Sequence, residues 1–262
     1  MHTGPIGIFD SGIGGTTIWR EIRKILPHED TLYLADSLHA PYGEKSAAEI
    51  LRLSIKNTDF LLERGCKLIV VACNTATTNA ISFLRETYTV PFIGIEPAIK
   101  PAALRSYAKK VGVLATKGTL ASDLFHSTAK NHASGISIIE KDGAGLVPLI
   151  EAGKIHTEET KNVLQQLLQP MIQQGIDYLV LGCTHYPYLI PVLKEILPQN
   201  VEIIDSGAAV AKQTHAILQQ KELLNPSQKM GRSVFYTNLD LAILTAFLKE
   251  DQHPLEISRC PF

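Results

Sequence analysis

Two short stretches, LIVVACNTA at residues 68–76 and LVLGCTHYP at residues 179–187, decide how the chain is expected to fold. Each begins as a continuous apolar run and ends in a cysteine that is followed by small polar residues. A short apolar run of this kind is typical of a strand that is buried on both faces, as in a parallel sheet. The pattern therefore predicts that Cys73 and Cys183 follow the ends of two buried strands.

Similar apolar runs recur along the chain and alternate with amphipathic stretches. Strands are predicted at residues 6–9, 31–34, 68–72, 92–95, 111–114, 136–139, 178–181 and 201–204. Ser46 with Glu49 forms a capping box that predicts a helix running to Gly65. Thr157, which precedes two glutamates, predicts a second helix that stops at Gly175. This alternation predicts an α/β fold of doubly wound, mainly parallel sheets.

The chain also contains an internal echo. IGIFDSGIGG, which starts at Ile6, and VGVLATKGT, which starts at Val111, both have the pattern of a strand that ends in a small polar loop before a helix. Cys73 follows the first and Cys183 the second at a comparable distance, and another strand-like run comes after each cysteine. We interpret the echo as two related α/β units.

The composition of the chain is that of a globular protein without a global charge bias. Its 262 residues are 45% hydrophobic and 19% charged, with a formal net charge of −1, so neither nucleic acid nor a membrane is expected as a partner. The N-terminal segment MHTGPIGIFDSG has no basic region before a long apolar stretch, and the four widely spaced cysteines are typical of reduced thiols. We expect a soluble, cytoplasmic protein of one large domain or two ordinary ones.

Ligands of open α/β sheets bind beyond the carboxyl ends of the strands. The polar residues predicted there are Asp10-Ser11-Gly12, Asp36-Ser37, Cys73-Asn74-Thr75, Thr116, Thr119 and Cys183-Thr184-His185. A nucleotide site is one interpretation, because DSGIGGTT at residues 10–17 is glycine-rich and Asp36 ends the next strand. The glycines do not fit G-x-G-x-x-G, however, and Asp10 would repel a phosphate, so this interpretation comes second.

The cysteines allow several interpretations. Cys66 and Cys260 are expected to be packing residues. A disulfide is disfavoured in the cytoplasm, and zinc is disfavoured because no Cys-x-x-Cys pair occurs. A single nucleophile, Cys183 with His185 as its base, is chemically conceivable but leaves Cys73 without a role.

Two cysteines that face each other across a cleft suit the inversion of a stereocentre. One thiolate removes a proton from one face of the carbon while one thiol delivers a proton to the other face. A free cysteine titrates near pH 8.5, so modest shifts give both forms near neutral pH. Such a reaction gives Cys73 and Cys183 a joint purpose.

The motifs quoted above, together with ADSLHAPYGEKS (35–46), IGIEPA (93–98), DSGAAVAK (205–212) and FYTNL (235–239), resemble in order the signatures of the glutamate racemases, in the aspartate/glutamate racemase superfamily. The resemblance covers nearly the whole chain. It implies an isomerase that uses no cofactor and no metal and interconverts L- and D-glutamate for peptidoglycan synthesis. Members of the family are commonly dimers, so a homodimer is compatible with it.

The resemblance also implies two pseudo-symmetric α/β domains with the active site in the cleft between them. The first comprises residues 1–96 and 208–262 and carries Asp10 and Cys73. The second comprises residues 97–207 and carries Glu151, Cys183 and His185.

Individual roles follow from the same resemblance. Cys73 is expected to take the proton from D-glutamate, and Cys183 from L-glutamate. Asp10 is the expected helper of Cys73, and His185 that of Cys183. Glu151 matches an auxiliary acidic position, although a solvated helix carboxylate is the alternative. The expected substrate-binding residues are Asp10, Ser11, Pro41, Tyr42, Gly43, Asn74, Thr75, Thr116, Thr119, Thr184 and His185.

Three alternatives stay open at this point. The enzyme could racemise aspartate or another amino acid on the same scaffold, or it could be a nucleotide-binding module that uses the glycine loop. It could also be a non-catalytic protein that only keeps the fold. Asp36 is the weakest of the catalytic candidates.

Overall fold

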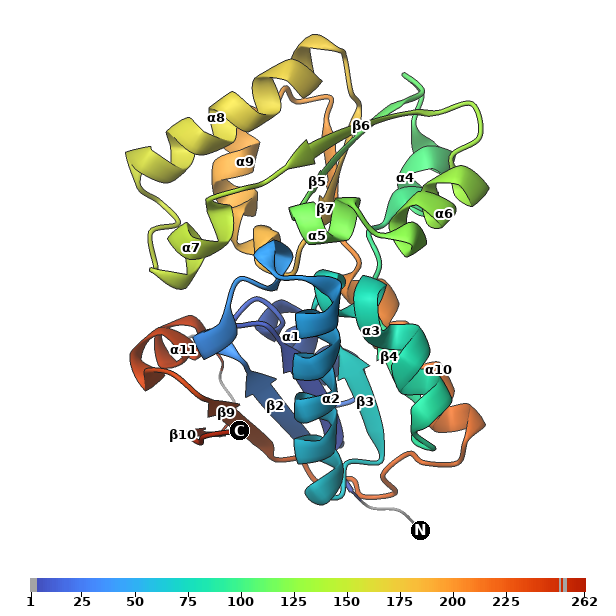
Figure 1. The fold of residues 1–262 in the computed structure, drawn as a ribbon, viewed down its shortest axis with the longest axis vertical. Coiled ribbons are helices and arrows are strands. Elements are labelled where there is room, and N and C mark those ends of the chain that lie inside the picture. The colour runs from blue at the N-terminus through green and yellow to red at the C-terminus, as the bar shows by residue number, and fades with distance from the viewer. Residues whose placement is uncertain (1–3, 250, 252–253) are drawn as a thin grey trace.

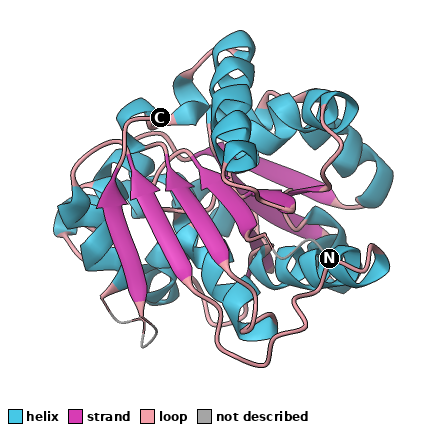
Figure 2. Ribbon diagram, turned by 90° about the horizontal axis from the view of Figure 1, so that it is seen from below, coloured by secondary structure: helices cyan, strands magenta, loops and turns pink. Residues whose placement is uncertain are grey.

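The computed structural model describes residues 4–249, 251 and 254–262, so Met1 to Thr3 of the N-terminal segment considered above lie outside the described residues. The described chain forms two lobes, each built on a parallel sheet (Figure 1). Every pair of neighbouring strands recorded in the two sheets is parallel, and Figure 2 shows the arrows of one sheet side by side and pointing the same way. The predicted fold class is confirmed.

The first sheet has six strands in the order β10-β9-β2-β1-β3-β4. Their bounds are β1 (Ile6–Asp10), β2 (Thr31–Ala35), β3 (Leu68–Val71), β4 (Phe92–Gly94), β9 (Ser233–Thr237) and β10 (Leu255–Arg259). The second sheet has four strands in the order β6-β5-β7-β8. Their bounds are β5 (Lys110–Ala115), β6 (Ser137–Asp142), β7 (Tyr178–Gly182) and β8 (Glu202–Ile204).

The internal similarity of the sequence corresponds to two sheets that repeat the same strand connectivity. The order β2-β1-β3-β4 in the first sheet has the same connectivity as β6-β5-β7-β8 in the second. Ile6 pairs with Leu68 in the first sheet, and Val111 pairs with Tyr178 in the second. Cys73 lies five residues beyond Leu68, and Cys183 lies five residues beyond Tyr178. The two cysteines therefore occupy equivalent places.

Helices cover both sheets (Figure 1). Those around the first sheet are α1 (Thr16–Ile25), α2 (Ala47–Glu63), α3 (Asn74–Thr87), α10 (Gly207–Gln220) and α11 (Leu241–Leu248). Those around the second are α4 (Ile99–Arg105), α5 (Lys117–Leu120), α6 (Asp123–His132), α7 (Leu146–Glu151), α8 (Glu158–Gln173) and α9 (Ile190–Ile196). Short 3-10 turns are η1 (Ser37–His39), η2 (Tyr42–Glu44) and η3 (Tyr186–Leu189). Of the helices in the described ranges, none has the length and apolar character needed to span a bilayer.

The two predicted helix starts are confirmed, with one correction. The Ser46 hydroxyl accepts a hydrogen bond from the backbone N–H of Glu49, as an N-cap should. The Glu49 side chain binds the Arg52 guanidinium, at 2.8 and 2.9 Å, so the predicted capping box forms only one of its two bonds. Thr157 caps α8 in the same way, and that helix is followed by Gly175 at φ +76°.

All eight predicted strands are present, with ends that differ by at most two residues except for the carboxyl end of β6, which lies three residues further along. Strands β9 and β10 were not predicted. They lie at the outer side of the first sheet, where β9 alternates between buried and half-buried residues and β10 is largely exposed. An outer strand lacks the continuous apolar run that identifies a central parallel strand. The predicted domain boundaries, at 96/97 and 207/208, fall between the strands of the two sheets and stay a prediction.

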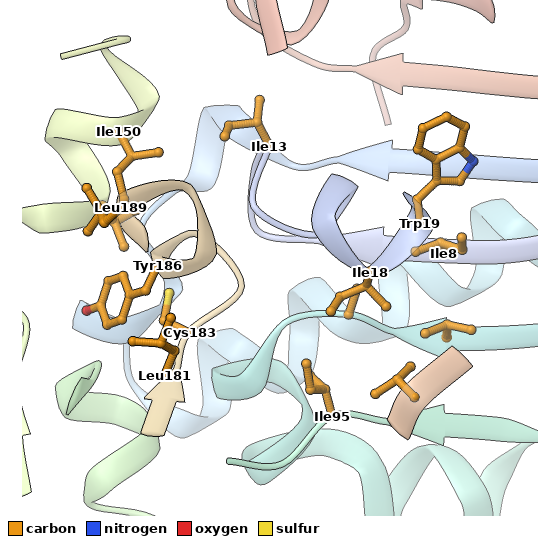
Figure 3. Close-up of a cluster of buried hydrophobic side chains, with 14 of the residues drawn as sticks. Ile8, Ile13, Ile18, Trp19, Ile95, Ile150, Leu181, Cys183, Tyr186 and Leu189 are labelled. Carbon is orange, nitrogen blue, oxygen red and sulfur yellow. The ribbon is translucent and has the colours of Figure 1, made fainter. Parts of the chain in front are cut away.

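The apolar core continues from one lobe into the other. One cluster of buried side chains contains Ile8, Ile18 and Trp19 of the first lobe together with Leu181, Cys183 and Tyr186 of the second. Figure 3 shows Cys183 beside Leu181 and Tyr186, with Ile13 of the first lobe facing Ile150 and Leu189. The carboxyl end of β7 is therefore packed against the first lobe.

Candidate active site

A single cavity at the junction of the lobes contains both cysteines that follow strand ends. The side chains around it leave about 260 Å³ of space, part of which is open to solvent. Its lining residues are Ser11, Pro41, Tyr42, Gly43, Cys73, Asn74, Thr75, Thr116, Val147, Cys183, Thr184 and His185. All of them lie in segments that follow the carboxyl ends of parallel strands, Val147 in α7 after β6. Eleven of the twelve were expected at the site, nine as substrate-binding residues and the two cysteines as acid and base. Val147, which bears no reactive group, was not expected there.

Cys73 is the N-cap of α3, a helix of 14 residues. Its sulfur accepts from the backbone N–H of Ala76 at 3.4 Å, and its thiol lies 3.7 Å from the Ser11 hydroxyl. Burial and the nearby carboxyl group of Asp10 raise the pKa of Cys73 to about 12, even though the bond from Ala76 lowers it. At neutral pH Cys73 is therefore a thiol.

Cys183 stands at one end of a relay of side chains. Its sulfur lies 3.8 Å from Nδ1 of His185, and Nε2 of His185 lies 2.6 Å from Oε1 of Glu151. Burial lowers the pKa of His185, but the bonds to Cys183 and Glu151 outweigh it and raise that pKa well above the ordinary 6.5. An imidazolium held by a carboxylate thus lies beside the Cys183 sulfur and favours negative charge there.

Glu151 is not a solvated helix carboxylate. It is the last residue of α7, and its Oε1 also accepts from the backbone N–H of Ile13 at 2.8 Å. One oxygen of the second lobe therefore holds both His185 and the glycine loop of the first lobe. This contact gives Glu151 the surroundings expected of an auxiliary acid in the relay.

Asp10 connects the lobes at the other side of the cavity. It is fully buried at the end of β1, and its two carboxylate oxygens accept from Gly12 N–H and from the Thr184 hydroxyl, each at 3.0 Å. Burial raises the pKa of Asp10, although His185 and the two donors lower it. Asp10 acts on Cys73 through its charge, which raises the pKa of that thiol.

The glycines of the loop at residues 10–17 allow the side chains of Glu151 and His185 to lie close to its backbone, and they do not form a phosphate site. A Cβ atom at Gly12 would lie 1.9 Å from Oε1 of Glu151, and one at Gly14 would lie 2.3 Å from Nδ1 of His185. The backbone N–H groups of Gly12 and Ile13 already donate to Asp10 and Glu151. The geometry therefore accounts for the glycines without the nucleotide that was the second interpretation of the motif.

Asp36 does not line the cavity but supports its wall. It is fully buried and accepts from the Tyr42 hydroxyl at 2.5 Å, from His39 at 2.6 Å and from Asn238 at 2.5 Å. Burial alone would raise the pKa of Asp36, but these donors and the Lys56 charge outweigh it and lower that pKa. Tyr42, which lines the cavity, is held by Asp36 and by Asn57. Asn238 lies in the FYTNL motif quoted for the resemblance, but no role was predicted for it.

The threonines form a second wall. Thr75 and Thr116 line the cavity and hydrogen-bond each other at 2.8 Å across the two lobes. Thr119 is fully buried behind them and contacts both, at 3.2 and 3.1 Å. Thr119 was expected to contact substrate directly, and the structure places it as the support of the two threonines that do line the cavity.

The remaining cysteines lie elsewhere. Cys66 is buried in the core of the first lobe, and burial raises its pKa to about 12. Cys260 lies half-buried after β10. Within the described ranges, no three His, Cys, Asp or Glu side chains are clustered so that they could hold a metal ion.

Comparison with known proteins gives the family. Residues 16–214 match the model of the Asp/Glu/Hydantoin racemase family. The chain belongs to this family. Within the family, it is similar to the glutamate racemase of Herpetosiphon aurantiacus, with 44% identity over 242 residues that cover 92% of this chain and 95% of the relative.

Solved structures of racemases have the same architecture. A glutamate racemase isoform from Bacillus anthracis matches with a TM-score of 0.89 and 28% identity, covering 100% of this chain and 99% of that one. The Escherichia coli glutamate racemase, in complex with L-glutamate and the activator UDP-MurNAc-ala, matches with a TM-score of 0.85 and 32% identity, covering 98% of each chain. An aspartate racemase from Picrophilus torridus matches at 0.56 with 19% identity, over 84% and 95% of the chains, and shares the fold alone.

Proposed function

We propose that this protein is a cofactor-independent glutamate racemase, in which Cys73 and Cys183 exchange protons with the α-carbon of glutamate from opposite faces. The observation that carries the proposal is the pair of cysteines at equivalent strand ends, both lining one cavity at the junction of the lobes. The similarity to glutamate racemases along nearly the whole chain supports glutamate as the substrate.

The two thiols have different electrostatic surroundings. The raised pKa of Cys73 keeps that residue protonated, while the charged His185 lies beside Cys183. In the direction from L- to D-glutamate, the Cys183 thiolate takes the α-proton and becomes a thiol. The Cys73 thiol then donates its proton to the opposite face of the carbanion and becomes a thiolate. The reverse direction exchanges these roles.

Polar groups in the cavity suit the charged ends of an amino acid. In the described part of the chain, Oδ1 of Asn74 is buried without a hydrogen-bond partner, although Asn74 lines the cavity. A buried acceptor of this kind favours a donor such as the ammonium group of the substrate. The hydroxyls of Ser11 and Thr75, with the N–H groups at the start of α3, suit the carboxylates.

The decisive experiment is exchange at the α-carbon. The purified protein is incubated with L-glutamate in D2O without added cofactor, while circular dichroism follows optical activity and NMR follows deuterium at the α-carbon. With the wild type we expect the optical activity of the substrate to disappear while deuterium enters at the α-carbon. In Cys73→Ser and Cys183→Ser we expect racemisation to be abolished or severely slowed. Full retention of optical activity without deuterium in the wild type would overturn the assignment to glutamate.

The second candidate is a racemase of the same family that acts on aspartate. The fold alone favours it, so a panel of amino acids in the same assay distinguishes the two. With glutamate as substrate, we infer that the protein acts in the cytoplasm and supplies D-glutamate for peptidoglycan, as a monomer or a homodimer.

A further inference from the structure

Outside the cavity, three segments far apart in the sequence meet at Tyr188. Nη1 of Arg20, in α1, donates to the Tyr188 hydroxyl at 2.9 Å. Nε and Nη2 of Arg20 bind the two carboxylate oxygens of Asp251, beyond α11, at 2.9 to 3.2 Å. The ring of Phe247, in α11, packs edge-on against that of Tyr188 with centroids 4.6 Å apart. We call Thr16, Arg20, Tyr188, Phe247 and Asp251 the Tyr188 clamp.

The hydrogen bonds of the clamp are mutually consistent. The Thr16 hydroxyl donates to the carbonyl of Ile13 at 2.6 Å, and it also contacts the Tyr188 hydroxyl. Since a hydroxyl has one proton, Tyr188 must donate to Thr16 and accept from Arg20. Each group therefore has one role, which fixes the position of the Tyr188 ring.

Tyr188 is coupled to the turn that carries Cys183. It lies in η3, where its backbone N–H donates to the carbonyl of His185 at 3.2 Å and that of Tyr186 donates to the carbonyl of Cys183 at 3.1 Å. The Thr17 hydroxyl, next to Thr16 in α1, shares its one proton between two carbonyls, that of Gly14 at 2.9 Å and that of Thr184 at 3.2 Å. The first turn of α1 thus holds both ends of the segment 183–188.

The two cysteines differ in their need for such support. Cys73 caps the 14-residue helix α3, whose own hydrogen bonds fix the turn. Cys183 precedes η3, a 3-10 turn of four residues, and a short turn of this type has poorer internal geometry. The Cys183 turn is therefore the one that gains most from an external clamp.

The ion pair between Arg20 and Asp251 is expected to be stronger than an ordinary surface ion pair. It is bidentate, and the side chains of Arg20 and Asp251 are only 26% and 15% exposed. Lys24 and Glu21, on the same helix, form a surface pair in which Lys24 is 68% exposed. This second pair serves as a matched control.

We propose that Arg20 and Tyr188 are positioning residues that hold the Cys183–His185 turn against α1, and that Asp251 makes this hold depend on the segment after α11. The consequence for racemisation rests on the proposed function. The consequence for the exposure of Cys183 does not, because it concerns the position of one thiol relative to the other.

The test combines thiol labelling with kinetics. Wild type, Arg20→Gln, Arg20→Lys, Tyr188→Phe, Asp251→Asn and the control Lys24→Gln are treated briefly with iodoacetamide, and mass spectrometry gives the labelling of Cys183 relative to Cys73, with Cys66 and Cys260 as internal references. Initial rates with both enantiomers of glutamate give kcat and KM.

We expect Arg20→Gln and Tyr188→Phe to raise the Cys183 to Cys73 labelling ratio about threefold or more and to lower kcat about tenfold, since a small misplacement of a reacting group has a large effect on rate. KM should change less, because the clamp does not touch the cavity. Arg20→Lys should recover part of both effects, and Arg20→Gln combined with Asp251→Asn should be no worse than Arg20→Gln alone.

An unchanged labelling ratio in both Arg20→Gln and Tyr188→Phe would overturn the proposal, whether or not kcat falls, because a general loss of stability affects both cysteines. Tyr188→Phe removes a single hydroxyl, so it remains informative if Arg20→Gln fails to fold. If the wild type does not racemise glutamate, the proposed function fails, and the labelling ratio still decides whether the clamp positions Cys183.

Discussion

The strand end at Cys73 and the strand end at Cys183 occupy equivalent places in sheets of the same connectivity, but the residues around them differ. Two positions after Cys73 stands Thr75, and two positions after Cys183 stands His185. Asp10 ends β1, whereas the equivalent residue of β5 is Ala115. One cysteine therefore has a helix start and a hydroxyl as neighbours, and the other has a charged imidazole. Repetition of the fold sets where the thiols lie, and the segment after each strand sets which groups surround each thiol.

The largest expected effect tests whether the two ends act as one unit. Cys73→Ala and Cys183→Ala should each lower kcat by about 10³-fold or more, and the double variant should be hardly worse than either single one. The reason is that each direction of the reaction needs both an acid and a base. Polarimetry or circular dichroism with each enantiomer measures the rates. Activity within tenfold of wild type in one single variant would show that only one cysteine is needed.

The next effect should be confined to the Cys183 end. His185→Asn removes the imidazole that the Cys73 end lacks, and we expect kcat to fall about 10²-fold, the usual range for loss of an acid–base group. Thr75→Ser, at the equivalent position of the first lobe, is the matched control and should remain within about threefold.

The pH dependence of kcat/KM tests the same role of His185. Because the pKa of His185 is raised above 6.5, its charge is present at neutral pH and is lost as the pH rises through that raised pKa. We expect kcat/KM to fall on the alkaline side, and Glu151→Gln, which removes one cause of the shift, should move this fall to lower pH. An unmoved alkaline limb in Glu151→Gln would count against the relay.

A smaller effect concerns stability, at a residue that only the first lobe has. Asp36→Asn should lower the free energy of unfolding by about 2–4 kcal/mol, because it removes a charged acceptor from several buried donors. The folded pKa of Asp36 is lowered, so its contribution is present above the unfolded value of 3.8 and is lost as the pH falls through the folded pKa. Urea unfolding at pH 7 and at pH 3 measures both. Equal losses at the two pH values would contradict this assignment.

The smallest effects should be the same in both lobes. Ser46→Ala and Thr157→Ala each remove an N-cap, of α2 and of α8, and should lower the free energy of unfolding by about 1 kcal/mol. Since neither residue lies at the cavity, kcat should stay at its wild-type value. Thermal unfolding and initial rates are measured for both variants. A loss of activity in either one would show that the end of that helix affects the active site.

Much of this architecture could be read from local patterns. The continuous apolar runs predicted the central strands because a parallel strand is buried on both faces. The caps of α2 and α8 were predicted because a side-chain oxygen satisfies a backbone N–H a few residues away. Strands β9 and β10 were missed because outer strands carry a weaker pattern, and the side chain of Glu49 was misplaced because Arg52 competes for it.

The sequence by itself determined that two cysteines lie at the ends of buried strands, and that polar side chains suited to an amino acid follow those ends. Only the tertiary structure decided which groups meet. Glu151 contacts Ile13 and His185, Asp10 contacts Thr184, and Arg20 joins Tyr188 to Asp251. The physical reason is that these contacts join segments far apart in the chain, whose distances depend on how two sheets pack, whereas strands and caps depend on residues a few positions apart.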